Sequence, residues 1–143
     1  MSRSGSRKNS PAGGMVIVDT SAWIPFFNRP ESTEKQIIDA LIDRGEVAVV
    51  GVVLAELLQG YRSPEERDEL KDALLALPYL GVSQATWISA GEISAGLLRK
   101  GITLPLTDLV IAAAAIEHRC SVYSMDAHFQ KIPGLIRYSP AAK

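Results

Sequence analysis

Short apolar runs alternate along the chain with longer stretches of helical character. The first run, Met-Val-Ile-Val at 15–18, has no polar position, which is typical of a strand buried on both faces. Similar runs follow, and the segments between them are long enough for helices. The pattern predicts strands at 15–18, 47–50, 80–83, 121–124 and 135–138, and helices at 31–44, 52–61, 64–77, 85–100 and 104–119.

Strands that alternate with helices of this length are typical of parallel βαβ units. We therefore predict an α/β fold, a three-layer α/β/α sandwich with a central, mainly parallel sheet. The segments 85–100 and 104–119 are rich in small residues, including the run 112–115, so we expect these helices to pack closely against other elements. Right-handed crossovers bring the carboxyl ends of the strands to one edge of such a sheet, where ligands bind.

Asp19 directly follows the first strand and so lies at this edge. Thr20 and Ser21 offer capping hydroxyls for a helix that begins here, and Pro25 predicts that this helix is short or kinked. Asp19 alone is open to two interpretations, a helix cap or a ligand-binding carboxylate. The other acids of the chain help to choose between them.

Most of the sixteen acids lie on polar helix faces or in first helical turns, as solvated surface residues do. Four others, Asp19, Glu56, Asp108 and Asp126, are set among apolar residues, where a lone charge is costly. Two of them follow predicted strands and two lie in or near the early turns of helices. Each has a local explanation as a cap, a first-turn acid or a half-exposed side chain, but a shared site at one edge of the sheet explains all four.

A cluster of carboxylates without nearby bases requires raised pKa values or a bound cation. Two unit charges about 4 Å apart interact by ~4 kcal/mol at an effective dielectric of 20. Oxygen ligands suit Mg²⁺ or Mn²⁺, and such an ion can bind a phosphate oxygen and generate hydroxide. We therefore predict Asp19, Glu56, Asp108 and Asp126 as metal-binding and catalytic residues. For His128, two residues after Asp126, we favour a structural role, with contact to the substrate as the alternative.

Composition narrows the setting in which the chain works. The single cysteine, Cys120, excludes an internal disulfide and a cysteine-based zinc cluster, and fits a reducing, cytoplasmic location. No apolar run approaches the ~20 residues of a membrane span, so we expect no membrane partner. Residues 1–14 are polar and rich in Gly and Ser, which predicts a disordered N-terminal extension or an expression remnant ahead of a single domain at 15–140. The chain without residues 1–14 has twelve basic and sixteen acidic residues, which gives a net charge of −4. This negative charge argues against broad, nonspecific binding of polyanions.

With these residues in place, the chain resembles PIN-domain ribonucleases, and more narrowly the VapC-type toxins of bacterial and archaeal toxin–antitoxin pairs. The resemblance covers residues 15–140 and rests on four motifs in order. They are Val-Asp19-Thr-Ser-Ala-Trp, Ala-Glu56-Leu-Leu-Gln-Gly, Thr-Asp108-Leu-Val-Ile-Ala-Ala-Ala and Ser-Met-Asp126-Ala-His-Phe.

The resemblance implies endonucleolytic cleavage of RNA with Mg²⁺ or Mn²⁺ at the four acids. It also implies a homodimer and an inhibitory VapB-type antitoxin, and a role for Thr20 or Ser21 in orienting the carboxylates. Several large apolar residues follow Asp19 and Glu56 closely in the sequence. Helical spacing cannot direct all of these side chains into the core, so we expect some of them to form a groove for an amphipathic antitoxin segment. These residues are Trp23, Phe26, Phe27, Leu57, Leu58 and Tyr61.

Three other protein classes share some of these features. A receiver domain requires an acidic pair after the first strand and a lysine near a late strand, but Asp19 is followed by Thr20 and Ser21. A phosphatase of the aspartyl-phosphate type requires a second aspartate at Ser21. A non-catalytic PIN-like module that binds RNA or protein remains the main alternative, although the presence of all four acids argues against it.

Overall fold

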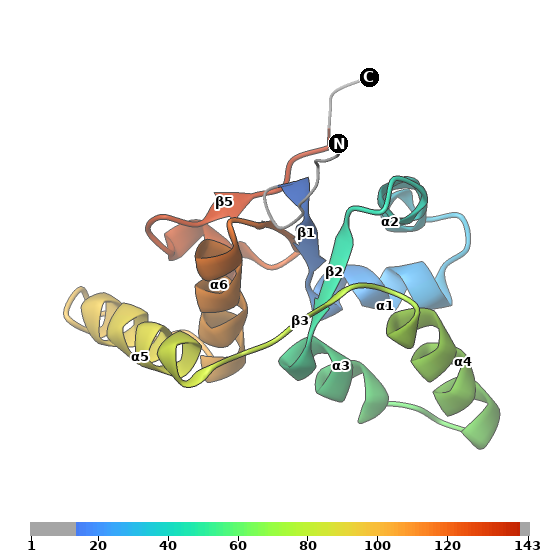
Figure 1. Ribbon diagram of the computed structural model, residues 1–143, viewed down its shortest axis with the longest axis horizontal. Coiled ribbons are helices and arrows are strands. Elements are labelled where there is room, and N and C mark those ends of the chain that lie inside the picture. Colours follow the sequence, from blue (N-terminus) through green and yellow to red (C-terminus); the bar gives the residue numbers. More distant parts are fainter. Residues whose placement is uncertain (1–13, 141–143) are drawn as a thin grey trace, which may run out of the picture.

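The computed structural model describes residues 14–140, so the prediction for the N-terminal head falls outside the described residues, apart from Gly14. This part of the chain contains five strands and six α-helices, and two α-helices follow each of the first three strands (Figure 1). The strands are β1 (Val16–Val18), β2 (Val47–Val50), β3 (Tyr79–Leu80), β4 (Ser121–Tyr123) and β5 (Ile136–Arg137). The helices are α1 (Thr20–Asn28), α2 (Thr33–Asp43), α3 (Gly51–Leu58), α4 (Pro64–Leu75), α5 (Gln84–Leu98), α6 (Leu106–His118) and the short 3-10 helix η2 (Ala127–Lys131).

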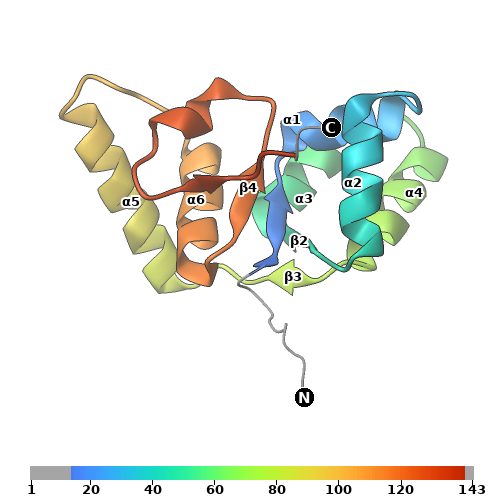
Figure 2. The ribbon, with the colours of Figure 1, turned by 90° about the horizontal axis from the view of Figure 1, so that it is seen from above.

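The strands form one parallel sheet in the order β3-β2-β1-β4-β5. Val16 of the central strand is in register with Val47 on one side and Ser121 on the other. Strands β1 and β2 are buried along their whole length, which explains why their sequences have no polar position. With helices flanking the sheet, the predicted three-layer α/β/α architecture is confirmed (Figures 1 and 2).

The core lies between the sheet and the helices that cover it. Ile17 of β1, Trp23 of α1 and Ile38 of α2 are almost inaccessible to solvent, and the whole segment 109–115 of α6 is buried. The small residues of α5 and α6 allow these two helices to pack against each other more extensively than any other pair of elements. Helix α5 lies on the outer side of α6, away from the sheet (Figures 1 and 2).

The structure differs from the predicted elements mainly at their ends. The third strand comprises only Tyr79 and Leu80, where the sequence predicted 80–83, because Ser83 caps α5 instead. Pro25 lies inside α1 and does not end it, since the helix continues to Asn28. None of the helices within residues 14–140 is long and apolar enough to cross a membrane.

Candidate functional site

Asp19 lies where the central strand ends and the first helix begins. Its backbone N–H donates to Tyr123 O (2.9 Å), which ties the end of β1 to the end of β4. Its Oδ2 accepts hydrogen bonds from the hydroxyls of Ser21 and Ser124, both at 2.8 Å, and from the Ser21 N–H at 3.3 Å. Asp19 is therefore both the N-cap of α1 and a carboxylate oriented by two hydroxyls, with only 5% of its surface exposed.

The two serine hydroxyls also hold the loop that carries the next acid. Ser21 Oγ accepts the backbone N–H of Met125, and Ser124 Oγ accepts that of Asp126, each at 2.9 Å. Each hydroxyl thus donates to Asp19 and accepts from the β4–η2 loop. The positions of Asp19 and Asp126 are coupled through these bonds.

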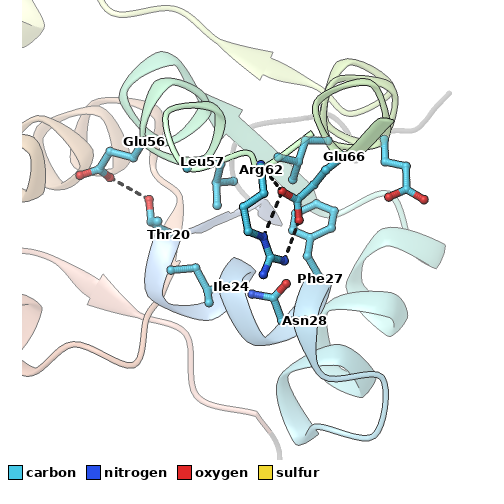
Figure 3. Close-up of a pocket in the computed structure, with 11 residues that line it drawn as sticks. Thr20, Ile24, Phe27, Asn28, Glu56, Leu57, Arg62 and Glu66 are labelled. Atoms are coloured by element: carbon cyan, nitrogen blue, oxygen red, sulfur yellow. Dashed lines mark hydrogen bonds and ion pairs between the residues drawn. The ribbon is translucent and has the colours of Figure 1, made fainter. Parts of the chain in front are cut away.

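Glu56 approaches the same edge from α3. Its Oε1 accepts a hydrogen bond of 2.7 Å from Thr20 Oγ1, the residue after Asp19 (Figure 3). The bond links α1 to α3 and fixes the half-buried glutamate side chain. The sequence expectation that Thr20 or Ser21 orients the carboxylates agrees with these bonds, Thr20 serving Glu56 and Ser21 serving Asp19.

Asp108 and Asp126 meet at His128. Asp108 lies in the first turn of α6, and its Oδ2 is 2.7 Å from His128 Nδ1. Asp126 Oδ1 accepts the backbone N–H of His128 at 2.9 Å, as the cap of η2, and lies 3.2 Å from the same Nδ1. One ligand atom from each of these three residues lies within 4.8 Å of the others.

The carboxylates at this edge of the sheet interact electrostatically. Burial raises the pKa of Asp108, and the negative charges of Asp19 and Asp126 raise it further, against the opposing hydrogen bond from His128. The site therefore disfavours its own negative charge when no cation is present. Asp19 and Glu56 lie outside the close group of three, but Asp19 is near enough to act on Asp108, and Thr20 joins Glu56 to the residue beside Asp19.

The structure shows contacts of two further residues that the sequence did not predict. Ser124 was not singled out, although it occupies the first position after β4 as Asp19 does after β1, and Val18 is in register with Tyr123. The ring of His128, for which the sequence favours a structural role, contacts two of the four acids, a contact that is compatible with that role. An imidazole nitrogen therefore lies beside the carboxylate oxygens of Asp108 and Asp126.

Comparison with known proteins identifies the family. The PIN domain family model matches residues 16–135. The chain belongs to the PIN domain family. This PIN domain is 27% identical over 132 residues to the VapC ribonuclease Mb1587 of Mycobacterium bovis, covering 90% of this chain and 98% of that protein. It is 31% identical over 106 residues to the ribonuclease VapC21 of Mycobacterium tuberculosis, covering 70% and 75% of the two chains.

Solved structures of a toxin–antitoxin complex and of a toxin have the same fold. VapBC2 of Rickettsia felis, bound to a DNA fragment from its promoter, superposes with a TM-score of 0.75 at 24% identity over 87% of this chain and 97% of that one. The sarcin–ricin-loop-cleaving toxin VapC20 of Mycobacterium tuberculosis superposes with a TM-score of 0.64 at 18% identity, covering 87% and 99%. These likenesses confirm the PIN-like architecture predicted from the four motifs.

A groove of about 300 Å³ adjoins the acidic edge of the PIN domain, between α1, α3 and α4 (Figure 3). Its lining combines apolar side chains from all three helices with carboxylates and one arginine. The lining residues are Thr20, Ile24, Phe27, Asn28, Glu56, Leu57, Gly60, Arg62, Glu66, Glu69 and Leu70. Because Glu56 lines the groove, an occupant of the groove reaches the acidic edge.

The apolar residues near Asp19 and Glu56 divide between the core and this groove. Trp23 is 1% exposed, and its ring lies 5.0 Å from that of Phe26 and 5.6 Å from that of Phe27. Ile24, the residue after Trp23, is 49% exposed and lines the groove. Tyr61 is 45% exposed but is not among the lining residues. The expectation that some of the apolar side chains reach the surface is confirmed.

Proposed function

We propose that this PIN domain, which we place at residues 15–140, is a Mg²⁺- or Mn²⁺-dependent endoribonuclease that acts in the cytoplasm as the toxin of a type II toxin–antitoxin pair. The observation that carries the proposal is the meeting of carboxylates from the ends of β1 and β4 and the first turn of α6 at one edge of the sheet. The raised pKa of Asp108 supports the proposal, because burial and the charges of Asp19 and Asp126 disfavour the ionised carboxylate when no cation offsets them. The curated relatives named as VapC ribonucleases support the choice of RNA as substrate.

The donor chemistry of the site fits a hard divalent ion. In the proposed mechanism Asp108 and Asp126 hold the cation, and Asp19 and Glu56 complete the acidic edge around it. A cation bound there supplies charge stabilisation to the phosphodiester and a water of lowered pKa. The hydrogen bonds from Ser21 and Ser124 keep Asp19 in one orientation, so the carboxylate does not reorganise during the reaction.

The direct test of this function is cleavage of RNA by the purified chain. We expect cleavage with Mg²⁺ or Mn²⁺, loss of cleavage on addition of EDTA, and recovery when the metal is restored in excess. RNA binding without cleavage under all metal conditions would favour the non-catalytic PIN-like module instead. Cleavage that persists unchanged in EDTA would contradict the metal-dependent mechanism.

The charge balance of the site predicts how Asp108→Asn changes stability. The amide keeps the shape of the side chain and removes a charge that burial, Asp19 and Asp126 disfavour, so the Tm of the metal-free variant should equal or exceed that of the wild type. Adding metal at 100 times its Kd should stabilise the wild type by about 2.7 kcal/mol, a rise in Tm of several degrees, and the variant by less. Thermal unfolding measured by circular dichroism, with and without Mg²⁺ or Mn²⁺, gives both quantities. Asp43→Asn, at the exposed end of α2, is the matched control. Equal metal-induced shifts in Tm for Asp108→Asn and the wild type would refute Asp108 as a ligand.

We propose an inhibitory VapB-type antitoxin as the protein partner of this toxin. The support comes from structural relatives such as VapBC2 of Rickettsia felis, which are toxin–antitoxin complexes. The groove beside Glu56 is the surface of this chain that fits such a partner, because it combines an apolar floor with access to the acidic edge.

We also propose that two copies of the chain associate through α5. This helix has one charged residue, Glu92, in its fifteen positions, and its main packing partner is α6. A helix that is apolar around most of its circumference is normally covered on more than one side. Its uncovered surface carries Trp87, Ile88 and Leu98, which are 47%, 57% and 54% exposed. An identical face on a second copy is self-complementary, as a two-fold dimer requires.

A further inference from the structure

His128 faces two carboxylates that come from different parts of the chain. The cap formed by Asp126 fixes the first turn of η2, and this turn directs the imidazole back toward the N-terminal turn of α6. As a result Nδ1 lies 2.7 Å from Asp108 Oδ2 and 3.2 Å from Asp126 Oδ1. The His128 side chain is 38% exposed, so it is not part of the buried apolar core.

These distances are compatible with shared coordination of one cation. An octahedral ion about 2.1 Å from each ligand holds adjacent ligand atoms about 3 Å apart. The two N···O separations, 2.7 and 3.2 Å, bracket that value. When Nδ1 carries a proton, it can donate a hydrogen bond to the carboxylates. When the imidazole is neutral with Nδ1 unprotonated, the lone pair of Nδ1 points in the same direction and can bind a cation.

We propose that His128 is a nitrogen ligand of the metal site and shifts its selectivity from Mg²⁺ toward Mn²⁺. The inference rests on the proposed metal-dependent function and adds a residue to the four acids. Carboxylates suit Mg²⁺ and Mn²⁺ alike, whereas an imidazole nitrogen favours transition metals over the harder Mg²⁺. The mixed set of Asp108, Asp126 and His128 therefore binds Mn²⁺ more tightly than a set of carboxylates alone.

The test compares His128→Gln with the wild type. Glutamine retains an N–H donor for Asp108 and removes the imidazole, so the variant separates a hydrogen-bonding role from a coordinating one. Mn²⁺ binding is measured by electron paramagnetic resonance, and Mg²⁺ binding by competition with Mn²⁺. We expect about tenfold weaker Mn²⁺ binding in the variant, a much smaller change for Mg²⁺, and the loss of the ¹⁴N coupling that an imidazole ligand gives to bound Mn²⁺.

His118→Gln is the matched control, since His118 is the other histidine of the chain and is the last residue of α6, the helix that has Asp108 in its first turn. Ten residues of helix put it about 15 Å from Asp108, and its ring contacts Gly81 O at 3.4 Å. The control should keep the wild-type affinities and the ¹⁴N coupling.

Several results would overturn the ligand role of His128. One is equal weakening of Mn²⁺ and Mg²⁺ binding in His128→Gln, which would show that the ring only positions the carboxylates. A second is persistence of the ¹⁴N coupling in His128→Gln. A third is a wild type that binds Mn²⁺ without ¹⁴N coupling and loses this binding in Asp108→Asn; the metal site would then stand without His128 as a ligand. A wild type that binds no Mn²⁺ would overturn the proposed function together with the role of His128.

Discussion

Asp19→Asn is expected to lower the rate of RNA cleavage at least about 100-fold while the protein remains folded. The amide has the shape of the carboxylate, and its oxygen can still accept the hydroxyl bonds of Ser21 and Ser124. Asparagine is also a good N-cap, so α1 keeps its first turn. The substitution removes one negative charge at the edge where we propose that the cation binds. Loss of one preorganised electrostatic group costs about 10²–10³ in rate.

Rates are measured on a short labelled RNA with Mg²⁺ in excess, and circular dichroism confirms that the variant is folded. Asp43→Asn provides the control for charge alone, because Asp43 is an exposed acid at the end of α2, away from the sheet edge that carries Asp19. It should cleave at the wild-type rate. Full activity in Asp19→Asn, in Asp108→Asn and in the double variant would show that these acids are not the catalytic site.

The sequence predicts the architecture well where burial is complete. Strands β1 and β2 lie in the middle of the sheet and have helices on both sides, so each of their positions is apolar and the runs are easy to recognise. Strand β3 is a two-residue edge strand with an exposed Tyr79, and a pattern that short has no clear period. Its end was misplaced because Ser83 forms a capping box with Thr86 and so belongs to the next helix.

The acids could be selected from the sequence because their apolar neighbours make them conspicuous. Their local roles and the proposed shared site turn out to be compatible, since Asp19 and Asp126 cap α1 and η2 while facing the same sheet edge. The contacts of Ser124 and His128 could not be predicted in this way. They depend on the register of β1 with β4 and on the direction in which η2 turns, and neither is encoded in a local pattern.

The surface near the acids was predicted only in outline. Helix α1 carries apolar residues at adjacent positions, so helical spacing alone does not show which of them faces the sheet. In the structure Trp23 is buried against Phe26 and Phe27, whereas Ile24 is 49% exposed and lines the groove together with Phe27. Ile24 is therefore a better probe of the groove than Tyr61, which lies outside its lining.

The groove has the features of a site for an amphipathic segment with a basic side chain. Ile24 and Phe27 from α1 face Leu57 from α3, and acids lie at both ends, with Glu56 toward the sheet edge and Glu66 on α4 (Figure 3). Glu66 is held ionised because hydrogen bonds from the Arg62 side chain and backbone N–H lower its pKa. The Arg62–Glu66 pair is exposed, so a partner can exchange it for its own contacts at little cost. We expect a basic side chain that passes along the groove to reach Glu56 and to compete with the proposed metal ion.

Ile24→Glu is therefore expected to weaken binding of the cognate antitoxin by at least about thirtyfold, or about 2 kcal/mol, the usual cost of losing a central interface residue. The substitution replaces an apolar contact by a carboxylate that the partner would have to bury near Glu56 and Glu66, and the side chain is 49% exposed, so the fold should tolerate the change. Ile136→Glu is the matched control, because Ile136 on β5 is 66% exposed and is not part of the groove lining. Isothermal titration calorimetry with purified antitoxin gives the affinities, and the antitoxin concentration needed to halve RNA cleavage gives an independent measure. If inhibition instead requires Ile136 and is unaffected at Ile24, the antitoxin docks elsewhere, and metal competition through the groove is wrong.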